Sequence, residues 1–180
     1  SIAVPGLSLE HPDRYALDIL SVILGEGMSS RLFLEVRERQ GLAYDIHSSV
    51  ICFQDCGAFV ISAGVDPRKV YEAVFTIISQ VNNLKDGVPE EELEIAKRLS
   101  AGRILLKMED TQAVAGWIGI QEMLMGQILD LDQVIKKIQS VTTYELRRVA
   151  KEILVSEKLT MALVGPSRGH SRLRKLLKAS

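Results

Sequence analysis

The stretch from Gly25 to Ser49 carries two polar side chains whose types and spacing could do chemistry. Arg37 precedes Tyr44 by seven residues, and the segment between them reads as a helix end followed by a strand start. A guanidinium donates hydrogen bonds to carbonyl or carboxylate oxygens, and a tyrosine hydroxyl donates to an oxyanion. Two such donors could hold an extended peptide backbone. Two alternatives remain open at this point: Arg37 pairs with acidic neighbours on the surface, and Tyr44 belongs to the core.

Other motifs that indicate a catalytic centre do not occur in this sequence. His11, His47 and His170 lie far apart, and neither H-E-x-x-H nor H-x-x-E-H is present. His47 with Cys52 and Cys56 lacks a fourth ligand and does not match the spacing of a common zinc knuckle. The pattern of a dinucleotide or phosphate loop and the G-x-S-x-G elbow are also missing. We therefore expect no catalytic residue and no metal ligand in this chain.

Apolar periodicity predicts the elements that position these side chains. The first helix should end at the glycines near residue 25, and Ser29 or Ser30 can cap the next one. We predict helices over residues 12–24, 30–39, 67–81, 89–107, 111–125, 131–138, 143–153 and 171–178, and strands over 2–9, 44–53, 58–65 and 159–164. The first strand has the character of a sheet edge. This order predicts one α+β domain over residues 1–180, with a mostly antiparallel β-sheet backed by α-helices.

Composition and charge narrow the class of protein. The 180 residues are 47% hydrophobic and 25% charged, ordinary values for a globular domain. The net charge of -1 argues against nucleic acid or an acidic membrane as partner, and no apolar run is long enough to cross a bilayer. Two cysteines in such a domain are typical of free, buried thiols and favour the cytoplasm, although a disulfide is sterically conceivable. The chain begins with Ser1 inside a strand pattern, so we expect a piece of a longer polypeptide.

The Gly25–Ser49 stretch resembles the C-terminal half-domain of the pitrilysin, insulinase and mitochondrial-processing-peptidase family of zinc metallopeptidases, especially its bacterial processing-protease branch. The most specific matches are Gly25, Gly27, Met28, Ser29, Ser30, Arg31, Leu32, Phe33, Glu35, Arg37, Glu38, Gly41, Leu42, Ala43 and Tyr44. Weaker matches are Gly57, Phe59, Lys107, Met108, Glu109, Asp110, Gly126, Asp130, Val141, Thr142 and 163–166. The resemblance therefore extends over nearly the whole chain.

The resemblance implies two similar α+β halves that close around an unfolded substrate. In that family the N-terminal half supplies H-x-x-E-H and a distal glutamate, and the C-terminal half supplies an arginine and a tyrosine seven residues apart. Arg37 and Tyr44 match this pair, so Tyr44 should help to hold the scissile region and Arg37 should contact the substrate backbone. The implied function is the substrate-binding half of a bacterial zinc metalloendopeptidase, inactive alone. The implied partners are the zinc-binding N-terminal half and a peptide substrate.

Two other readings remain. The chain could be a non-catalytic scaffold or partner subunit derived from the same family, with Arg37 and Tyr44 as relics. The discriminating feature is an H-x-x-E-H motif in the preceding sequence or in a partner. The domain could also form a homodimer, because a sheet face that normally meets the other half would leave apolar surface exposed.

Overall fold

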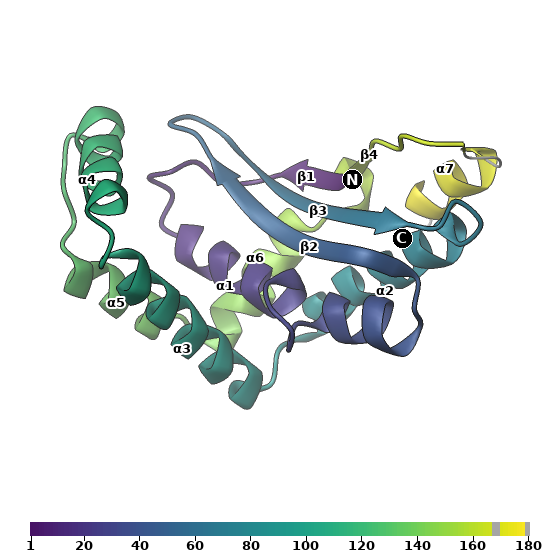
Figure 1. Cartoon of the computed structure of the whole chain (residues 1–180), viewed down its shortest axis with the longest axis horizontal. Helices are drawn as coiled ribbons and strands as arrows, with labels where there is room; N and C mark the ends of the chain where they lie inside the picture. The colour runs from purple at the N-terminus through teal and green to yellow at the C-terminus, as the bar shows by residue number, and fades with distance from the viewer. Residues whose placement is uncertain (167–169, 179–180) are drawn as a thin grey trace.

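The computed structural model describes residues 1–166 and 170–178 and folds them as an α+β domain around one sheet (Figure 1). The sheet is antiparallel with strand order β2-β3-β1-β4, so the predicted fold class is confirmed. The strands are β1 (Ile2–Pro5), β2 (Ala43–Cys52), β3 (Gly57–Val65) and β4 (Thr160–Met161). The helices are α1 (Arg14–Gly25), η1 (Phe33–Arg39), α2 (Val70–Asp86), α3 (Glu90–Lys107), α4 (Thr111–Met125), α5 (Leu131–Ser140), α6 (Thr143–Ile153), the short η2 (Ser156–Lys158) and α7 (His170–Lys178).

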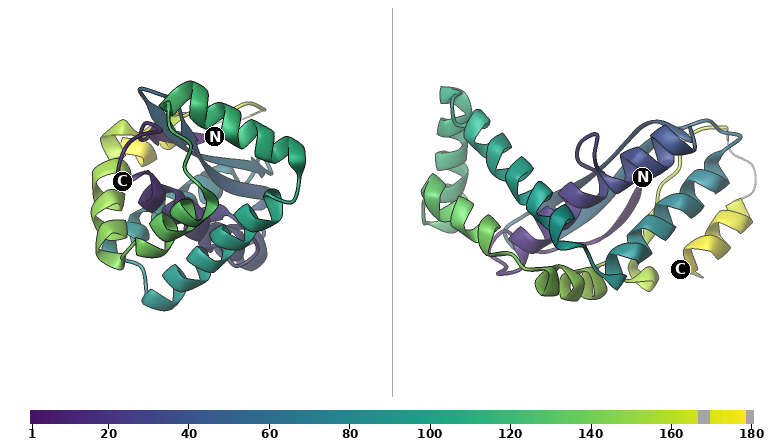
Figure 2. Two further views of the ribbon diagram at one scale, coloured as in Figure 1. Left: turned by 90° about the vertical axis from the view of Figure 1, so that its left-hand side faces the viewer. Right: turned by 90° about the horizontal axis from the view of Figure 1, so that it is seen from below.

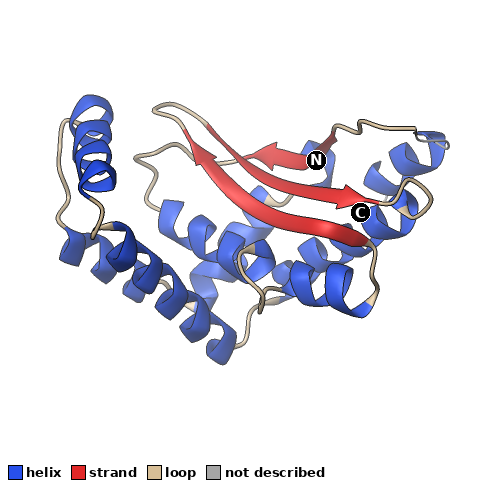
Figure 3. Ribbon diagram, viewed as in Figure 1, coloured by secondary structure: helices blue, strands red, loops and turns tan. Residues whose placement is uncertain are grey.

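The sheet buries one face and leaves the other open. Figure 3 shows the strands as one layer with helices against a single side of it. Because side chains alternate along a strand, Phe59 and Ile61 of β3 point into the core at 1% and 3% exposure. Val60 between them lies on the other face, beside its strand partners Ala3 and Ser49, and all three are half-buried. The open face is therefore available for contact.

Helix α1 packs directly beneath β2. A Cβ atom on Gly25, the last residue of α1, would lie 2.5 Å from the backbone nitrogen of Ser48, so only glycine permits this approach. The Ser48 hydroxyl donates to the carbonyl of Ser21 at 2.8 Å and ties the strand to the helix. The apolar stripe predicted for α2 is also buried, at Val70, Ala73, Val74, Ile77, Ile78 and Val81.

Several details differ from the sequence-based predictions. Strand β1 was expected at a sheet edge, but it lies between β3 and β4. Strand β4 has only two residues, because β1 pairs with Thr160 and Met161 alone. Both cysteines are free thiols as predicted, but Cys56 is exposed rather than buried, since it sits in the tight turn between β2 and β3.

Helix α4 is apolar nearly all round, yet it is largely exposed. Trp117, Ile120 and Leu124 were expected on one apolar side, but Ile120 is 57% exposed and Trp117 is only partly covered. Met123 is 83% exposed, and only Gln121 is buried. Figures 1 and 2 place α4 at the end of the molecule opposite α7. Neither α4 nor any other helix in the described ranges is long and apolar enough to cross a membrane.

Candidate functional site

Arg37 lies on η1, which is a π-helix rather than the predicted α-helix. The backbone N–H of Gln40 donates to the backbone carbonyl of Glu35, five residues earlier, at 3.2 Å. Ser30, one of the two predicted caps, instead donates its hydroxyl to the Gly27 carbonyl at 2.7 Å. Hydrogen bonds to the fifth preceding residue insert one extra residue into a helical turn, and such turns occur frequently at functional sites. The side chains of this turn are thereby redirected relative to an α-helix.

The Arg37 guanidinium lies on the surface and is held by only weak contacts. It stacks over the Phe33 ring at 4.8 Å, measured to the ring centroid. Its contact with the Glu38 carboxylate, at 3.9 Å, is too long for a hydrogen bond. The side chain is 41% exposed, so it is partly open to solvent. The surface pairing considered for Arg37 therefore exists only as a weak contact.

Tyr44 lies at a β-bulge at the start of the edge strand β2. Ala43 pairs with Val65 and Asp45 with Gly64, so Tyr44 is an extra residue opposite the regular partner strand. A bulge bends its strand and re-aims a side chain. The Tyr44 side chain is accordingly 88% exposed, which excludes the alternative that it belongs to the core.

A polar network holds the end of η1 in place. Glu35 accepts hydrogen bonds from Gln40 at 2.8 Å and from Arg39 at 2.9 Å. Both bonds lower the pKa of the Glu35 carboxyl below its ordinary value, and the bond from Gln40 has the larger effect. Gln40 in turn accepts a bond from the Thr76 hydroxyl of α2 at 3.2 Å. The turn that leads from Arg37 to Tyr44 is thus fixed to α2.

The other end of η1 is fixed to α3. Arg31, just before η1, donates to both carboxylate oxygens of Glu92, at 2.8 Å and 2.6 Å. Paired bonds of this kind fix orientation as well as distance. Lys69 adds a bond of 3.2 Å to the Gly41 carbonyl between η1 and β2. Both candidate donors are therefore presented from an ordered junction.

Two polar residues beside Tyr44 were not among the predicted site residues. Asp45 and His47 follow it on β2, and their side chains are 62% and 54% exposed. The His47 Nδ1 lies 3.4 Å from an Asp45 carboxylate oxygen, an ion pair only when the imidazole is protonated. The period of two residues along β2 could have placed Asp45 and His47 on one face, but it assigns Tyr44 to the other, so their common exposure with Tyr44 depends on the bulge.

The described residues do not fit a zinc site. Within residues 1–166 and 170–178, no group of three or more His, Cys, Asp or Glu side chains could hold a metal ion. The combination of His47 with the two cysteines therefore does not form a binding site. The side chain of His170 lies outside what the structure describes.

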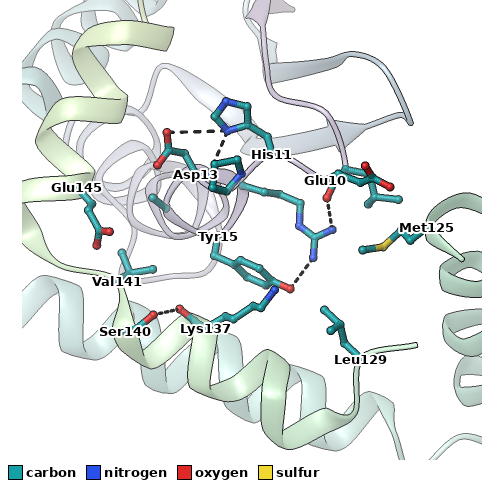
Figure 4. Close-up of a pocket in the computed structure, with 14 residues that line it drawn as sticks. Glu10, His11, Asp13, Tyr15, Met125, Leu129, Lys137, Ser140, Val141 and Glu145 are labelled. Atoms are coloured by element: carbon teal, nitrogen blue, oxygen red, sulfur yellow. Dashed lines mark hydrogen bonds and ion pairs between the residues drawn. The ribbon is translucent and has the colours of Figure 1, made fainter. Parts of the chain in front are cut away.

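Figure 4 shows a pocket of about 270 Å³ near the start of α1, closed by residues of α5 and the α4–α5 connection. Its polar groups mostly bind one another. Arg14 donates to the Leu9 carbonyl at 2.7 Å and to the Tyr15 hydroxyl at 2.8 Å, and Lys137 lies over the Tyr15 ring. Leu9 is bonded to the segment that follows β2, so the pocket lies at the opposite end of β2 from the η1–β2 junction. It is not part of the candidate site.

The sequence of this chain matches a known family. The family profile described as "Peptidase M16 inactive domain" matches residues 1–100, more than half of the chain. The chain belongs to the peptidase M16 family. The predicted resemblance to the C-terminal half-domain of this zinc metallopeptidase family is therefore confirmed.

Bacterial relatives of this M16 domain are described as zinc proteases. A protein of Streptomyces coelicolor described as an uncharacterized zinc protease is 34% identical over 166 residues, which are 92% of this chain and 36% of the relative. A Bacillus subtilis protein of the same description is 34% identical over 163 residues, 90% of this chain and 40% of the relative. The chain thus spans well under half the length of these relatives.

Solved structures share the fold of this M16 domain. A protease from Helicobacter pylori superposes with a TM-score of 0.80 and 26% identity, over 88% of this chain and 38% of that one. A peptidase M16 inactive domain from Pseudomonas fluorescens gives a TM-score of 0.78 at 24% identity, over 88% and 39%. A chain of complex III2 from Candida albicans gives 0.84 at 19% identity, over 98% and 45%. The last two likenesses concern the fold alone.

Proposed function

We propose that this M16 domain is the substrate-binding C-terminal half of a zinc metalloendopeptidase that cleaves peptides or unfolded protein segments in a chamber between two halves. The observation that carries the proposal is the η1–β2 junction, where a π-turn presents Arg37 and a β-bulge presents Tyr44. The relatives described as zinc proteases supply the reaction class. In this proposal the N-terminal half holds the zinc ion; the described residues of this chain include no group of three or more His, Cys, Asp or Glu side chains that could hold a metal ion.

The two donors have distinct roles in this proposal. The exposed Tyr44 hydroxyl donates to the scissile carbonyl oxygen and binds it more strongly as negative charge develops there. Arg37 donates through its planar fork to backbone carbonyls of the substrate and fixes its register. The stacking of Arg37 on Phe33 occupies the flat face of the guanidinium and leaves its N–H edge for the substrate.

Substitution of each donor in the parent peptidase tests these roles. Tyr44→Phe removes one hydroxyl, and we expect kcat to fall by about 10²- to 10³-fold, as for other oxyanion donors. Arg37→Ala should mainly raise KM, because it removes binding of the substrate backbone. Tyr144→Phe, at a 75% exposed position on α6, is the matched control and should leave both constants unchanged. Wild-type cleavage by the Arg37 and Tyr44 variants would remove the proposed roles.

The alternative is a non-catalytic scaffold or partner subunit. The chain of complex III2 shows that the same fold also occurs within a large assembly, although that likeness concerns the fold alone. An H-x-x-E-H motif in the parent or in a co-purifying partner supports the peptidase. If neither protein carries the motif and neither cleaves peptides, the scaffold function replaces it.

A further inference from the structure

A cleft separates α4 from α1 and from the edge strand β2. It consists of two adjoining cavities of about 420 Å³ and 550 Å³. The cavities share five lining residues, which are Arg14, Asp18, Val50, Trp117 and Val134. Because α4 stands at the end of the molecule, the cleft is a feature of the surface rather than of the core. Its combined volume can take several side chains.

The cleft combines apolar walls with an unpaired hydrogen-bond acceptor. Val50, Trp117 and Ile120 supply apolar surface. The half-buried Asp18 carboxyl makes no hydrogen bond or ion pair with the described residues. Gln121 is only 7% exposed; its amide oxygen accepts a bond from Leu129, but its Nε2 is a buried donor without an acceptor among the described residues. Because this nitrogen is itself buried, a ligand in the cleft does not reach it.

A peptide segment fits this set of groups. Its N–H can donate to Asp18, and its side chain can pack on the apolar walls. The edge strand β2 connects the two places, since Tyr44 lies near its start and Val50 lies in the cleft. Six residues of extended chain span about 20 Å. A substrate that follows β2 from the η1–β2 junction therefore reaches the cleft about six residues further along.

We propose that the cleft between α4 and β2 is a specificity subsite that binds one large apolar side chain of an extended peptide substrate, about six residues from the residue held at Tyr44. This proposal rests on the proposed peptidase function and names the substrate that the parent enzyme prefers. The occupant is a peptide rather than a second copy of the chain, because the cleft adjoins β2, the strand that leads from the η1–β2 junction where the proposed function places the substrate. Contact with the apolar walls of the cleft strengthens peptide binding by the free energy of burying one side chain.

Trp117 is the single tryptophan of the chain, so its fluorescence reports on the cleft directly. The probe is an acetylated Gly-Ser peptide of about ten residues with one central leucine, and its control carries serine in place of that leucine. We expect a saturable blue shift of Trp117 emission with the leucine peptide. We expect no shift with the serine peptide, because burial of the leucine drives the contact.

Two glycines of α4 provide a matched pair of variants. A Cβ at Gly116 or Gly119 would meet nothing within 4 Å, but only Gly116 lines the cleft. Gly116→Leu should fill the cleft and weaken peptide binding by about tenfold to hundredfold, the worth of one buried leucine. Gly119→Leu should bind like the wild type.

Two results would overturn the proposal. One is the absence of any saturable Trp117 response to the leucine peptide, or equal binding by the Gly116→Leu and Gly119→Leu variants. The other is a concentration-dependent dimer in light scattering whose Trp117 emission is already shifted and insensitive to peptide, which would assign the cleft to a second copy. Neither measurement needs zinc or the other half. A failure here is thus distinguishable from a failure of the Arg37 and Tyr44 substitutions.

Discussion

Asp18 shows how one half-buried carboxyl couples the cleft to pH. Burial raises the pKa of its carboxyl from 3.8 to about 6; Arg14 opposes this shift and Glu26 adds to it. Because the folded state holds this proton more tightly than the unfolded state, the carboxyl is neutral at little cost below about pH 4. Its contribution to stability falls as the pH rises from about 4 to about 6, and stays low above that.

Asp18→Asn should therefore stabilise the protein at neutral pH. Each pKa unit corresponds to about 1.4 kcal/mol, so after allowance for partial exposure we expect a gain of about 2 kcal/mol in the free energy of unfolding at pH 7. At pH 4 the variant and the wild type should unfold alike, since the wild-type carboxyl is then largely protonated. Urea unfolding at both pH values measures this. If the variant and the wild type differed in unfolding free energy by the same amount at pH 7 and at pH 4, the raised pKa of Asp18 would not be the cause.

At the scale of elements, the contact of α1 with β2 determines where the edge strand lies. The end of α1 comes so close to Ser48 that a methyl group at Gly25 would overlap both its backbone nitrogen and its hydroxyl. Backbone atoms cannot yield as the tip of a side chain can, so relief requires the strand or the helix to move. Because β2 carries Tyr44 at its start, such a movement would reach the candidate site.

Gly25→Ala should lower the free energy of unfolding by about 2 to 4 kcal/mol, the range for a buried clash. The matched control is Gly102→Ala in α3, where a Cβ meets nothing within 4 Å. This variant should gain about 0.5 to 1 kcal/mol, because alanine favours the helix. Thermal unfolding of both variants measures the effects. If both variants lost the same amount of unfolding free energy, the close approach of α1 to β2 would not be the cause.

At the scale of the whole molecule, the chain represents 36% to 40% of the length of its curated relatives. We expect residues 1–180 alone to retain no zinc after dialysis and to cleave no peptide. Addition of the N-terminal half, expressed separately, should restore both properties by supplying the metal ligands. Metal analysis and a fluorogenic peptide assay measure this. If residues 1–180 carry Tyr44→Phe, the mixture should regain zinc but cleave about 10²- to 10³-fold more slowly than with the wild-type domain, whereas cleavage by residues 1–180 alone would contradict the proposed division of roles.

The sequence predicted regular elements well and irregular ones poorly. The stripe of α2 and the β2–β3 hairpin were found because burial follows the period of each element. The bulge at Tyr44 and the π-turn before Gln40 were not, because one inserted residue leaves no trace in a short periodic pattern. The position of β1 inside the sheet depends on β4, more than 150 residues away. The cleft was missed because an apolar helix such as α4 reads as a buried one.

The two irregularities at the η1–β2 junction make the site sensitive to chain length. Both the π-turn and the bulge are single-residue insertions, one into a helix and one into a strand. The pairing of β2 with β3 from Asp45 onward holds the strand in register, so removing a residue at the bulge shifts the residues before it by one position and turns their side chains to the opposite face of the sheet. Removing one from the helical turn rotates Arg37 about the helix axis. Substitutions between the two donors can leave them in place, but a change in the number of residues cannot.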